Sequence, residues 1–578
     1  MILLALKEYY DRMSADPESD IAPEGFEKKE LPFLIVINEQ GQFVNIEDTR
    51  EKVGNKLVGK TFLLPRSVGR SGSKSYETTF LLWDHIGYLL GLPTKDKKSI
   101  KQHQTWLKKL EEFPEILLDD IGVKAVCLFY KSNEISKAIV HPQIQECLKA
   151  LQCNMSFRLV SDIHPVPCRN MVTKFVIDNL KMVGNEVDRH KNINGICLVT
   201  GERGVIARTH GRTPIDKDSK ILVGFQKNSG YDSYGKEQGY NAPIIKSTEF
   251  AYTTALNTLL KSKSQRMLIG DASTVFWSEK QSCFESDFSL FFKEPEKDNP
   301  NAGNERVRAL FESANTGAYM EDNGDNRFYI IGLSPNVARI AIRFWQVGKV
   351  SEFATRIRQY FEDFAITKPP GEPEYYSILR ILANISPQDQ IENTPPNIAG
   401  EFMRSILGGT PYPTTLIQAV LRRIRSDTKD RVKPVRAALI KAYLNRFYRF
   451  YPNKKYKEVT RELDTNQLSV GYQLGRLFAV LEKIQEEAND GIKATIRERF
   501  YGAACATPVT VYANLLRLKN HHLAKLENQG RVVYFEKLLG EVMGNLSDFP
   551  AHLNLHEQGL FAIGYYHQRQ DFFKKKDN

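Results

Sequence analysis

Residues 474–484 read LGRLFAVLEKI, and this stretch sets the fold class of the C-terminal part of the chain. Its apolar residues recur at intervals of three and four, the spacing that places side chains on one face of a helix. The same spacing returns among the leucines of residues 515–523. Because no convincing strand pattern occurs beyond residue 373, we expect the C-terminal part to form a helical bundle.

A basic segment precedes these helices. Residues 421–457 contain thirteen Arg and Lys residues against two acids, Asp427 and Asp430. Such a one-sided concentration favours contact with a polyanion. Arg422 and Arg425 fall on one face of the predicted helix, and this spacing directs both side chains to the same side.

The residues before this region have the mixed pattern of an α+β fold. Strands are predicted over residues 31–45 (a hairpin turning at 39–41), 123–130, 157–161, 197–200, 265–277 (a pair) and 327–333, and helices over 2–13, 94–112, 249–261 and from 337 to 347. Residues 367–373 read TKPPGEP, the composition of a linker. We therefore expect an N-terminal α+β domain at 1–370 and a C-terminal helical domain at 371–578.

Length and composition bound the class of protein. A chain of 578 residues is too long for a single core and predicts roughly three or four structural units. The net charge of +11 is modest for this length, so its clustering carries more information. The seven cysteines form no Cys-x-x-Cys pair, which favours a reducing cytoplasm and disfavours a disulfide framework or a thiolate zinc site. We expect neither a signal peptide nor a membrane span.

The sequence lacks the common catalytic motifs for phosphate loops, zinc proteases and nucleophile elbows. His521 and His522 are adjacent, so they point to different helix faces and favour a structural or phosphate-facing role over metal ligation. The apolar residues around Asp84 and His85 favour a satisfied polar pair over a catalytic one. Asp271 has no second acid nearby, which favours a turn or cap. We predict no catalytic residue, no metal and no cofactor.

One polar segment has the residue types that a phosphate grip needs. Residues 62–74 read FLLPRSVGRSGSK, and three lysines precede them. Glycines allow close backbone approach, serines donate hydrogen bonds and the cations supply charge. We call residues 52–74 the grip segment; its candidate contacts are Lys52, Lys56, Lys60, Arg66, Arg70, Ser71, Ser73 and Lys74. The alternative is a solvated loop without a ligand.

A second segment is rich in amide and aromatic side chains. Residues 226–241 read QKNSGYDSYGKEQGYN. Gln and Asn carry both a donor and an acceptor and can read base edges, Lys can hold phosphates, and Tyr can stack on a base. We call residues 226–241 the readout segment; its candidate residues are Gln226, Lys227, Asn228, Lys236, Gln238 and Asn241.

Seven segments together resemble one family, the large subunit of the type I-C CRISPR surveillance complex, Cascade. They are FLLWDxxxYxLG at 80–91, YGKEQxYNAP at 234–243, DxxTVFW at 271–277, GLSPNxAR at 332–339, LGRLFAVLE at 474–482, AxATP at 504–508 and RxxxHHL at 517–523. Their order spans nearly the whole chain, which is far more specific than any single motif.

The resemblance implies a binding protein without catalytic activity, in the cytoplasm. Such subunits recognise the protospacer-adjacent motif on double-stranded DNA, promote unwinding and R-loop formation, and support the displaced strand. The implied partners are guide RNA, target DNA, the repeated backbone subunits, the guide-processing subunit, small subunits and a recruited helicase-nuclease. Residues 459–578 are expected to resemble the small subunit, which an internal start near Val459 in the same gene would also produce.

Within this framework the candidate residues divide into three groups. The grip segment would hold the duplex backbone, and the readout segment would probe the motif. The displaced strand would follow Arg422, Arg423, Arg425, Arg436, Lys441, Arg446 and Arg449; contact with neighbouring subunits or with guide RNA is the alternative for part of this set. Two rival functions remain open, a stand-alone nuclease with an unfamiliar site and a general RNA-binding protein.

Overall fold

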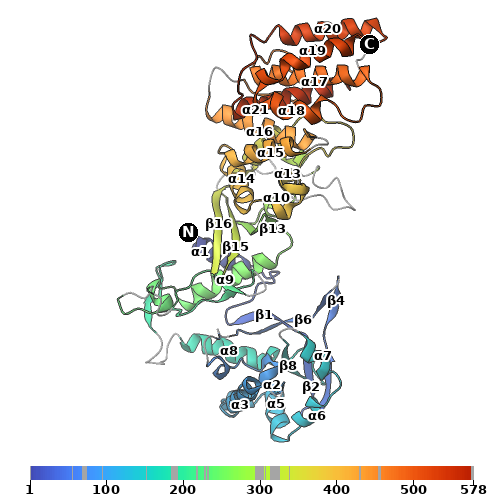
Figure 1. Ribbon diagram of the computed structural model, residues 1–578. Helices are drawn as coiled ribbons and strands as arrows, with labels where there is room; N and C mark the ends of the chain where they lie inside the picture. The colour runs from blue at the N-terminus through green and yellow to red at the C-terminus, as the bar shows by residue number, and fades with distance from the viewer. Residues whose placement is uncertain are drawn as a thin grey trace. The chain divides into compact units, whose positions relative to one another are not determined.

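The structure is a computed structural model. It describes residues 2–54, 56–67, 70, 74–93, 96–150, 153–183, 193–215, 219–226, 230, 234–292, 305, 307–312, 326–337, 339–427, 431–452 and 457–574. The chain forms two compact units, one of residues 1–258 with 337–339 and one of residues 259–336 with 340–578. Mixed sheets and helices occur first and helices alone follow, which confirms the predicted α+β class (Figure 1).

The first unit is built on a four-stranded sheet of order β3-β2-β8-β7. Its strands are β2 (Phe33–Ile37), β3 (Phe43–Asp48), β7 (Trp83–His85) and β8 (Asn154–Leu159). β2 lies between antiparallel β3 and parallel β8, and all five of its side chains are buried, so both faces of the sheet are covered there. The β2–β3 turn contains Gly41 with φ of 76°, which confirms the predicted hairpin.

Helices complete the first unit, and those at residues 86–89, 121–131 and 135–139 contact the strands of this sheet. They are α1 (Ile2–Ala15), α2 (Ile86–Leu89), α3 (Lys97–Glu111), α4 (Glu115–Leu118), α5 (Ile121–Lys131), α6 (Ile135–Ile139), α7 (Ile144–Lys149), α8 (Asn170–Val183) and α9 (Lys246–Lys261), whose last turn passes into the second unit. The predicted strand at 123–130 is wrong, since α5 occupies it. The Asp120 carboxylate caps α5 by accepting from the Gly122 and Val123 N–H groups, and this local cap overrides the β-branched composition.

Short two-stranded ribbons carry the polar segments of the first unit. They are β1 (Phe26–Leu31) with β6 (Lys60–Pro65), β4 (Glu51–Val53) with β5 (Lys56–Val58), and β9 (Asn194–Ile196) with β10 (Arg203–Val205). The short strands β11 (Arg212–Thr213) and β12 (Lys220–Ile221) pair with each other, and Ile221 also pairs in parallel with Arg339. The predicted strand at 197–200 is wrong. The strand ends at Ile196 and the chain turns, with the Gly201 N–H donating to the Cys197 carbonyl at 2.9 Å.

The second unit opens with antiparallel strands in the order β16-β15-β14-β13. They are β13 (Arg266–Ile269), β14 (Ala272–Ser278), β15 (Arg327–Asn336) and β16 (Arg339–Lys349, in this unit from Ile340). The first three confirm the predicted strands. The predicted helix at 337–347 is wrong, because Val337 has φ of 46° and turns the chain back into a strand. β16 is hydrogen-bonded to β15 in the sheet, which establishes it as a strand.

After Lys349 every regular element of the described residues is a helix. Together with α10 (Cys283–Phe288) they are α12 (Val350–Phe364), α13 (Ile378–Ile385), α14 (Pro396–Gly408), α15 (Thr414–Ser426), α16 (Pro434–Phe450), α17 (Val470–Ala488), α18 (Ile496–Ala506), α19 (Tyr512–Leu523), α20 (Gln529–Met543) and α21 (Leu555–Asp571), besides short 3₁₀ turns such as η4 (Pro387–Asp389). One continuous hydrophobic core joins them to the sheet.

The proposed linker at 367–373 lies inside the second unit, and the two compact units divide near residue 258 instead. The Thr367 N–H donates to the Arg461 carbonyl at 2.9 Å, and the Tyr566 hydroxyl donates to the Thr367 carbonyl at 2.8 Å. Proline and glycine content therefore marks a turn here, and the Thr367 backbone is held by the loop at Arg461 and by the helix that carries Tyr566.

Helices α17 and α21 pack closely against each other in the second unit. A Cβ atom built at Gly475 would lie 2.0 Å from the Phe561 carbonyl oxygen, and one at Gly564 would lie 2.1 Å from the Tyr472 carbonyl oxygen. The missing side chains allow the two backbones to touch. The glycine of the LGRLFAVLEKI stretch is therefore a packing residue.

Candidate nucleic-acid interface

The lysines of the grip segment face solvent where the structure describes their side chains. Lys52 on β4 and Lys60 on β6 are exposed, and the Lys74 side chain is 78% exposed although Glu77 lies 3.9 Å away. Lys56 lies on β5, and its side chain is outside the described part, as are Ser71 and Ser73. Lys52 and Lys60 lie on two-stranded ribbons and have no ion-pair partner among the described residues, so they can reach phosphates without breaking an ion pair. Lys74 would exchange its long contact with Glu77 for a phosphate.

Arg70 does not face solvent as a phosphate grip requires. Its Nη1 donates to Asp84 Oδ1 at 2.8 Å, its Nη2 donates to Asp84 Oδ2, and its Nε donates to the Thr78 carbonyl at 2.8 Å. The guanidinium carbon lies 3.7 Å from the ring centre of Phe80 and 4.1 Å from that of Tyr88. We therefore correct the expected role of Arg70 from backbone contact to an internal anchor of the grip segment.

Arg66 is also an internal anchor. Its Nη1 and Nη2 each donate to one carboxylate oxygen of Glu249 on α9, both at 3.1 Å. Glu249 Oε1 also accepts from the Gly211 N–H at 2.6 Å. The Arg66 side chain keeps 30% of its surface exposed, and its guanidinium lies over Phe250. Its charge is therefore balanced within the fold by Glu249.

The readout segment is described only in part. Gln226 and Lys236 are exposed, whereas Lys227 and Asn228 lie outside the described residues. The Asn241 amide donates to the Lys236 carbonyl at 3.1 Å and to the Gln238 carbonyl at 3.0 Å, so these hydrogen bonds stabilise the turn at residues 236–241. Gln238 is part-buried with φ of 49°.

Tyr234 is the most exposed aromatic side chain of the described readout segment, at 98%. It stands at φ of 51°, a left-handed conformation that is uncommon for a bulky residue. In the sequence Tyr234 is one of several tyrosines of this segment and has no distinguishing feature. In the structure it is exposed, whereas Tyr240 is part-buried. A fully exposed phenol ring offers a stacking surface for a base.

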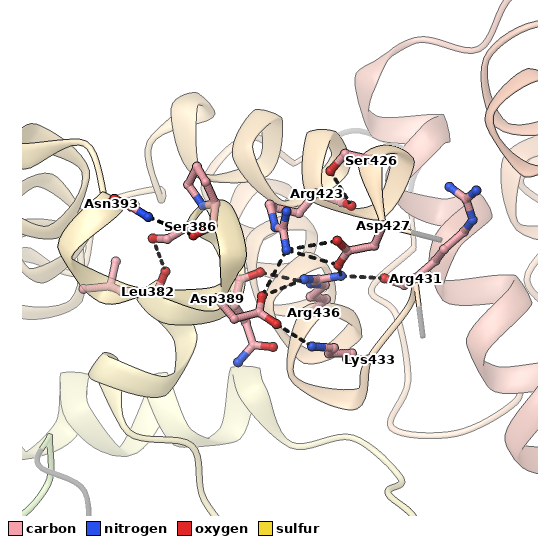
Figure 2. Close-up of polar contacts among 12 residues, drawn as sticks. Leu382, Ser386, Asp389, Asn393, Arg423, Ser426, Asp427, Arg431, Lys433 and Arg436 are labelled. Atoms are coloured by element: carbon pink, nitrogen blue, oxygen red, sulfur yellow. Dashed lines mark hydrogen bonds and ion pairs between the residues drawn. The ribbon is translucent and has the colours of Figure 1, made fainter. Parts of the chain in front are cut away.

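The start of the basic segment is an ion-pair cluster that joins α15, α16 and η4 (Figure 2). Arg423, Lys433 and Arg436 share the carboxylates of Asp389 and Asp427. The Arg436 side chain is fully buried; its Nη1 lies 2.5 Å from Asp427 and its Nη2 lies 3.1 Å from Asp389. Burial opposes ionisation of Asp389, but the bonds from Lys433 and the arginine charges hold its pKa below the ordinary value.

A second buried group lies further along α16. Lys441 donates to the Asp363 main-chain carbonyl at 3.0 Å, while Arg446 and Arg449 approach the Asp363 carboxylate. Lys441 and Arg446 are 3% and 5% exposed. Arg449 keeps about a third of its surface and also pairs with Glu458 at 3.0 Å. Burial lowers the pKa of Lys441 to about 8.

The structure therefore corrects part of the predicted strand path. Arg436, Lys441 and Arg446 lie in the interior with internal partners, so their side chains cannot also contact a strand at the surface. Arg423 is held by the same cluster as Arg436 (Figure 2). The excess of positive charge is visible in the sequence. The fold is needed to show that Asp363 and Asp389, which precede the basic segment, pair with these cations.

Arg422 and Arg425 remain at the surface of α15. Both are exposed, and the buried face of the helix is apolar, from Leu416 to Ile424. Arg425 donates to the Gln558 side chain. Among the described residues Arg422 has no ion-pair partner. The expectation that these two arginines share one helical face is confirmed.

The acids considered for catalysis have structural partners. Burial raises the pKa of Asp84, with Arg70 opposing this, and His85 Nδ1 accepts from the Gly87 N–H at 3.1 Å as the cap of α2. Asp271 follows β13 in its hairpin turn and accepts from Ser334 at 2.8 Å and from Arg343. Within the described ranges no three His, Cys, Asp or Glu side chains gather as a metal site would need. No described helix is long and apolar enough to cross a membrane.

Comparison with protein families gives one match. The family model described as CRISPR-associated protein (Cas_Csd1) matches residues 6–573, which is nearly the whole chain. No curated protein matches the chain. The family match spans both compact units, so it covers the grip segment, the readout segment and the helical region together.

Proposed function

Because this chain belongs to the CRISPR-associated Csd1 family, the large subunit of type I-C Cascade, we propose that it recognises the protospacer-adjacent motif on double-stranded DNA. In this proposal it opens the duplex, supports the displaced strand during R-loop formation and helps recruit the helicase-nuclease, with no catalytic step of its own. Sequence choice along the target then comes from guide RNA pairing. The family match over residues 6–573 is the observation that carries the proposal.

Duplex contact is assigned to the exposed lysines of the grip segment. Lys52, Lys60 and Lys74 are free to exchange water and counterions for phosphates. Lys56, Ser71 and Ser73 stay in this set on the evidence of sequence. Arg66 and Arg70 act behind these residues, as anchors of the ribbon and loop that carry them.

Motif readout is assigned to the readout segment. Exposed Gln226 can donate and accept at a base edge, and Lys236 can hold a nearby phosphate. Lys227 and Asn228 remain sequence predictions, and Gln238 and Asn241 shape the loop. Tyr234 is added as a stacking residue because its ring is almost fully exposed.

The displaced strand is assigned to the exposed face of α15. Arg422 and Arg425 can meet a strand backbone there, and the paired cations behind them hold α15 and α16 in place. A strand held by two or three such contacts would bind weakly alone and depend on salt. The alternative is that this face of α15 contacts guide RNA or a neighbouring subunit and not the displaced strand.

The remaining partners follow from membership in the family. The backbone subunits, the guide-processing subunit and the small subunits would flank this chain in the assembly. A small subunit that starts near Val459 would lose two hydrogen bonds that Val459 makes with Asn445 of α16, at 2.7 and 2.8 Å. Its first residues would therefore be less ordered than they are in the full chain.

Equilibrium binding tests motif recognition. The chain is assembled with guide RNA and its partner subunits, and the dissociation constant is measured for duplexes in which each motif base is changed in turn. Gln226→Ala is expected to lower discrimination at one base by about 1–3 kcal/mol while leaving affinity for motif-free DNA unchanged. Equal affinity for all duplexes before any substitution contradicts the proposal.

Incubation with Mg²⁺ or Mn²⁺ and end-labelled DNA tests the nuclease alternative. The isolated chain is expected to leave the DNA intact. Metal-dependent cleavage that Asp84→Asn or Asp271→Asn abolishes, with the fold retained, would establish an enzyme instead.

A further inference from the structure

The Glu249 carboxylate is bonded to two segments that are far apart in the sequence. It accepts hydrogen bonds from both terminal nitrogens of Arg66, which follows β6 in the grip segment. It also accepts from the Gly211 N–H, directly before β11. Glu249 is buried, and Thr253 of the same helix donates to it at 3.2 Å. All of these residues belong to the first unit.

The Gly211 side of this contact continues directly to the readout segment. The Gly239 N–H donates to the Arg208 carbonyl at 2.9 Å, three residues before Gly211. The Ala207 N–H donates to the Ile244 carbonyl at 2.8 Å. A Cβ atom at Gly239 would lie 2.4 Å from the Ala207 carbonyl oxygen, so the two backbones are in contact. The loop between β10 and β11 therefore contacts Glu249 through Gly211 and the readout segment through Ala207 and Arg208.

Gly211 is packed too closely to tolerate a side chain. A Cβ atom there would lie 2.8 Å from Thr253 Cγ2, 2.9 Å from Arg66 Nη2 and 3.1 Å from Glu249 Oε1. The absence of a side chain is what lets the Gly211 N–H and the Arg66 guanidinium reach the same carboxylate oxygen. The three groups form one rigid junction.

We infer that Glu249 is a positioning residue that fixes the grip segment relative to the readout segment, so that phosphate contact and motif readout depend on one junction. The inference rests on the proposed function. Arg66 holds the grip segment through this carboxylate, and Gly211 holds the backbone beneath Gly239. Loosening the junction lets the duplex be gripped with the motif out of register, which lowers motif preference.

The Arg70–Asp84 pair offers a matched control. It is also a bidentate, buried ion pair of the grip segment, but its other bonds go to the Thr78 carbonyl and to the Phe80 and His85 N–H groups. In the described part of the chain it makes no bond to residues 203–245. Weakening it disturbs the grip segment alone.

The test measures motif preference in the full assembly, as the ratio of dissociation constants for a motif-scrambled and a motif-bearing duplex. Glu249→Gln keeps the shape, Arg66→Met removes the charge partner, and Gly211→Ala forces the junction apart without removing a charge. Each is expected to lower the ratio by between about twofold and thirtyfold. The Arg66→Met, Glu249→Gln double variant is expected to be no worse than the worse single variant. Asp84→Asn is expected to keep the wild-type ratio.

The outcomes separate this inference from the function beneath it. A wild-type ratio of one overturns motif recognition and the inference with it. A normal wild-type ratio that Glu249→Gln and Gly211→Ala leave unchanged overturns the inference alone. Additive effects of the Arg66 and Glu249 variants, or a ratio lowered equally by Asp84→Asn, also overturn it, since either result shows general loosening. Gly211→Ala decides the question if Glu249→Gln disturbs assembly.

Discussion

The Arg70 guanidinium meets both carboxylate oxygens of Asp84, a side chain with no exposed surface. The pair is enclosed by the rings of Phe80 and Tyr88, and two backbone N–H groups complete the carboxylate's bonds. Arg70, although it lies in a Gly- and Ser-rich loop, is therefore held in place by the fold. The loop's reach toward DNA depends on this point and on Arg66.

Asp84→Ala tests the structural weight of the pair. Removing the carboxylate leaves a largely buried guanidinium without its counter-charge, and we expect the first unit to lose about 3 kcal/mol of unfolding free energy. Asp84→Asn keeps the shape of the side chain and one acceptor oxygen, so it should lose less. Urea unfolding followed by intrinsic tryptophan fluorescence, to which Trp83 and Trp106 of the first unit contribute, measures both. Equal, small losses for the two variants would show that the ion pair contributes little.

Sequence patterns predict elements well where one local signal dominates. The α+β class, the hairpin at 31–45 and the strands at 265–277 follow from periodicity and turn residues. The β-branched residues of α5 predict a strand, but they also occur in a capped helix. Pro335 predicts a helix start before β16, but the turn at Val337 prevents that helix. In each case a single cap or turn decides between two patterns of similar composition.

The candidate site is predicted less well, for a different physical reason. Sequence shows a cation but not the distant acid that neutralises it. Arg66 meets Glu249 across 183 residues, and Arg436 meets Asp389 across 47. Exposed cations such as Lys74 and Arg422 look the same as these in a sequence. Only the fold shows which cations are paired with internal acids and which are exposed and able to contact nucleic acid.

Gly475→Ala tests the close packing of α17 on α21. The new methyl group would meet the Phe561 carbonyl oxygen at 2.0 Å, so the helices must separate. We expect a loss of about 3 kcal/mol or more in the unfolding free energy of the second unit. Gly540→Ala on α20 is the control, since nothing lies within 4 Å of its Cβ position. It should stabilise by up to about 1 kcal/mol; similar losses at both sites would contradict this packing.

The buried ammonium of Lys441 predicts a pH dependence. Because burial lowers its pKa to about 8, the folded chain releases this proton before the unfolded chain does. The unfolded state then binds more protons above pH 8, so stability rises with pH in that window. From pH 7.5 to 9.5, the unfolding free energy of the wild type relative to Lys441→Met should rise by about 2 kcal/mol. A constant or falling difference would mean that Lys441 is not held as described.

Salt titration tests the exposed lysines of the grip segment. Each phosphate contact contributes about 0.9 to the slope of log affinity against log salt. Replacing Lys52, Lys60 and Lys74 by Ala should lower the slope for duplex DNA by about 2.7 in total. Lys124→Ala, an exposed lysine on α5, should leave the slope unchanged. An unchanged slope in the triple variant would remove these lysines from the interface.

The exposed face of α15 should matter after the duplex has been bound. Neutralising Arg422 and Arg425 to Gln is expected to slow strand opening more than the initial encounter, because the strand exists only once the duplex has opened. Stopped-flow measurement of encounter and opening on one duplex separates the two rates. Equal slowing of both steps would assign these arginines to general duplex attraction.

The most direct measurement of the central claim is duplex opening beside the motif, followed with a fluorescent base analogue at the first target position. The assembly is compared with one that lacks this chain, on DNA with an intact or a scrambled motif and the same guide-complementary sequence. Opening is expected only when the chain and the intact motif are both present. Opening of equal rate and extent without the chain, or with the scrambled motif, would contradict the account.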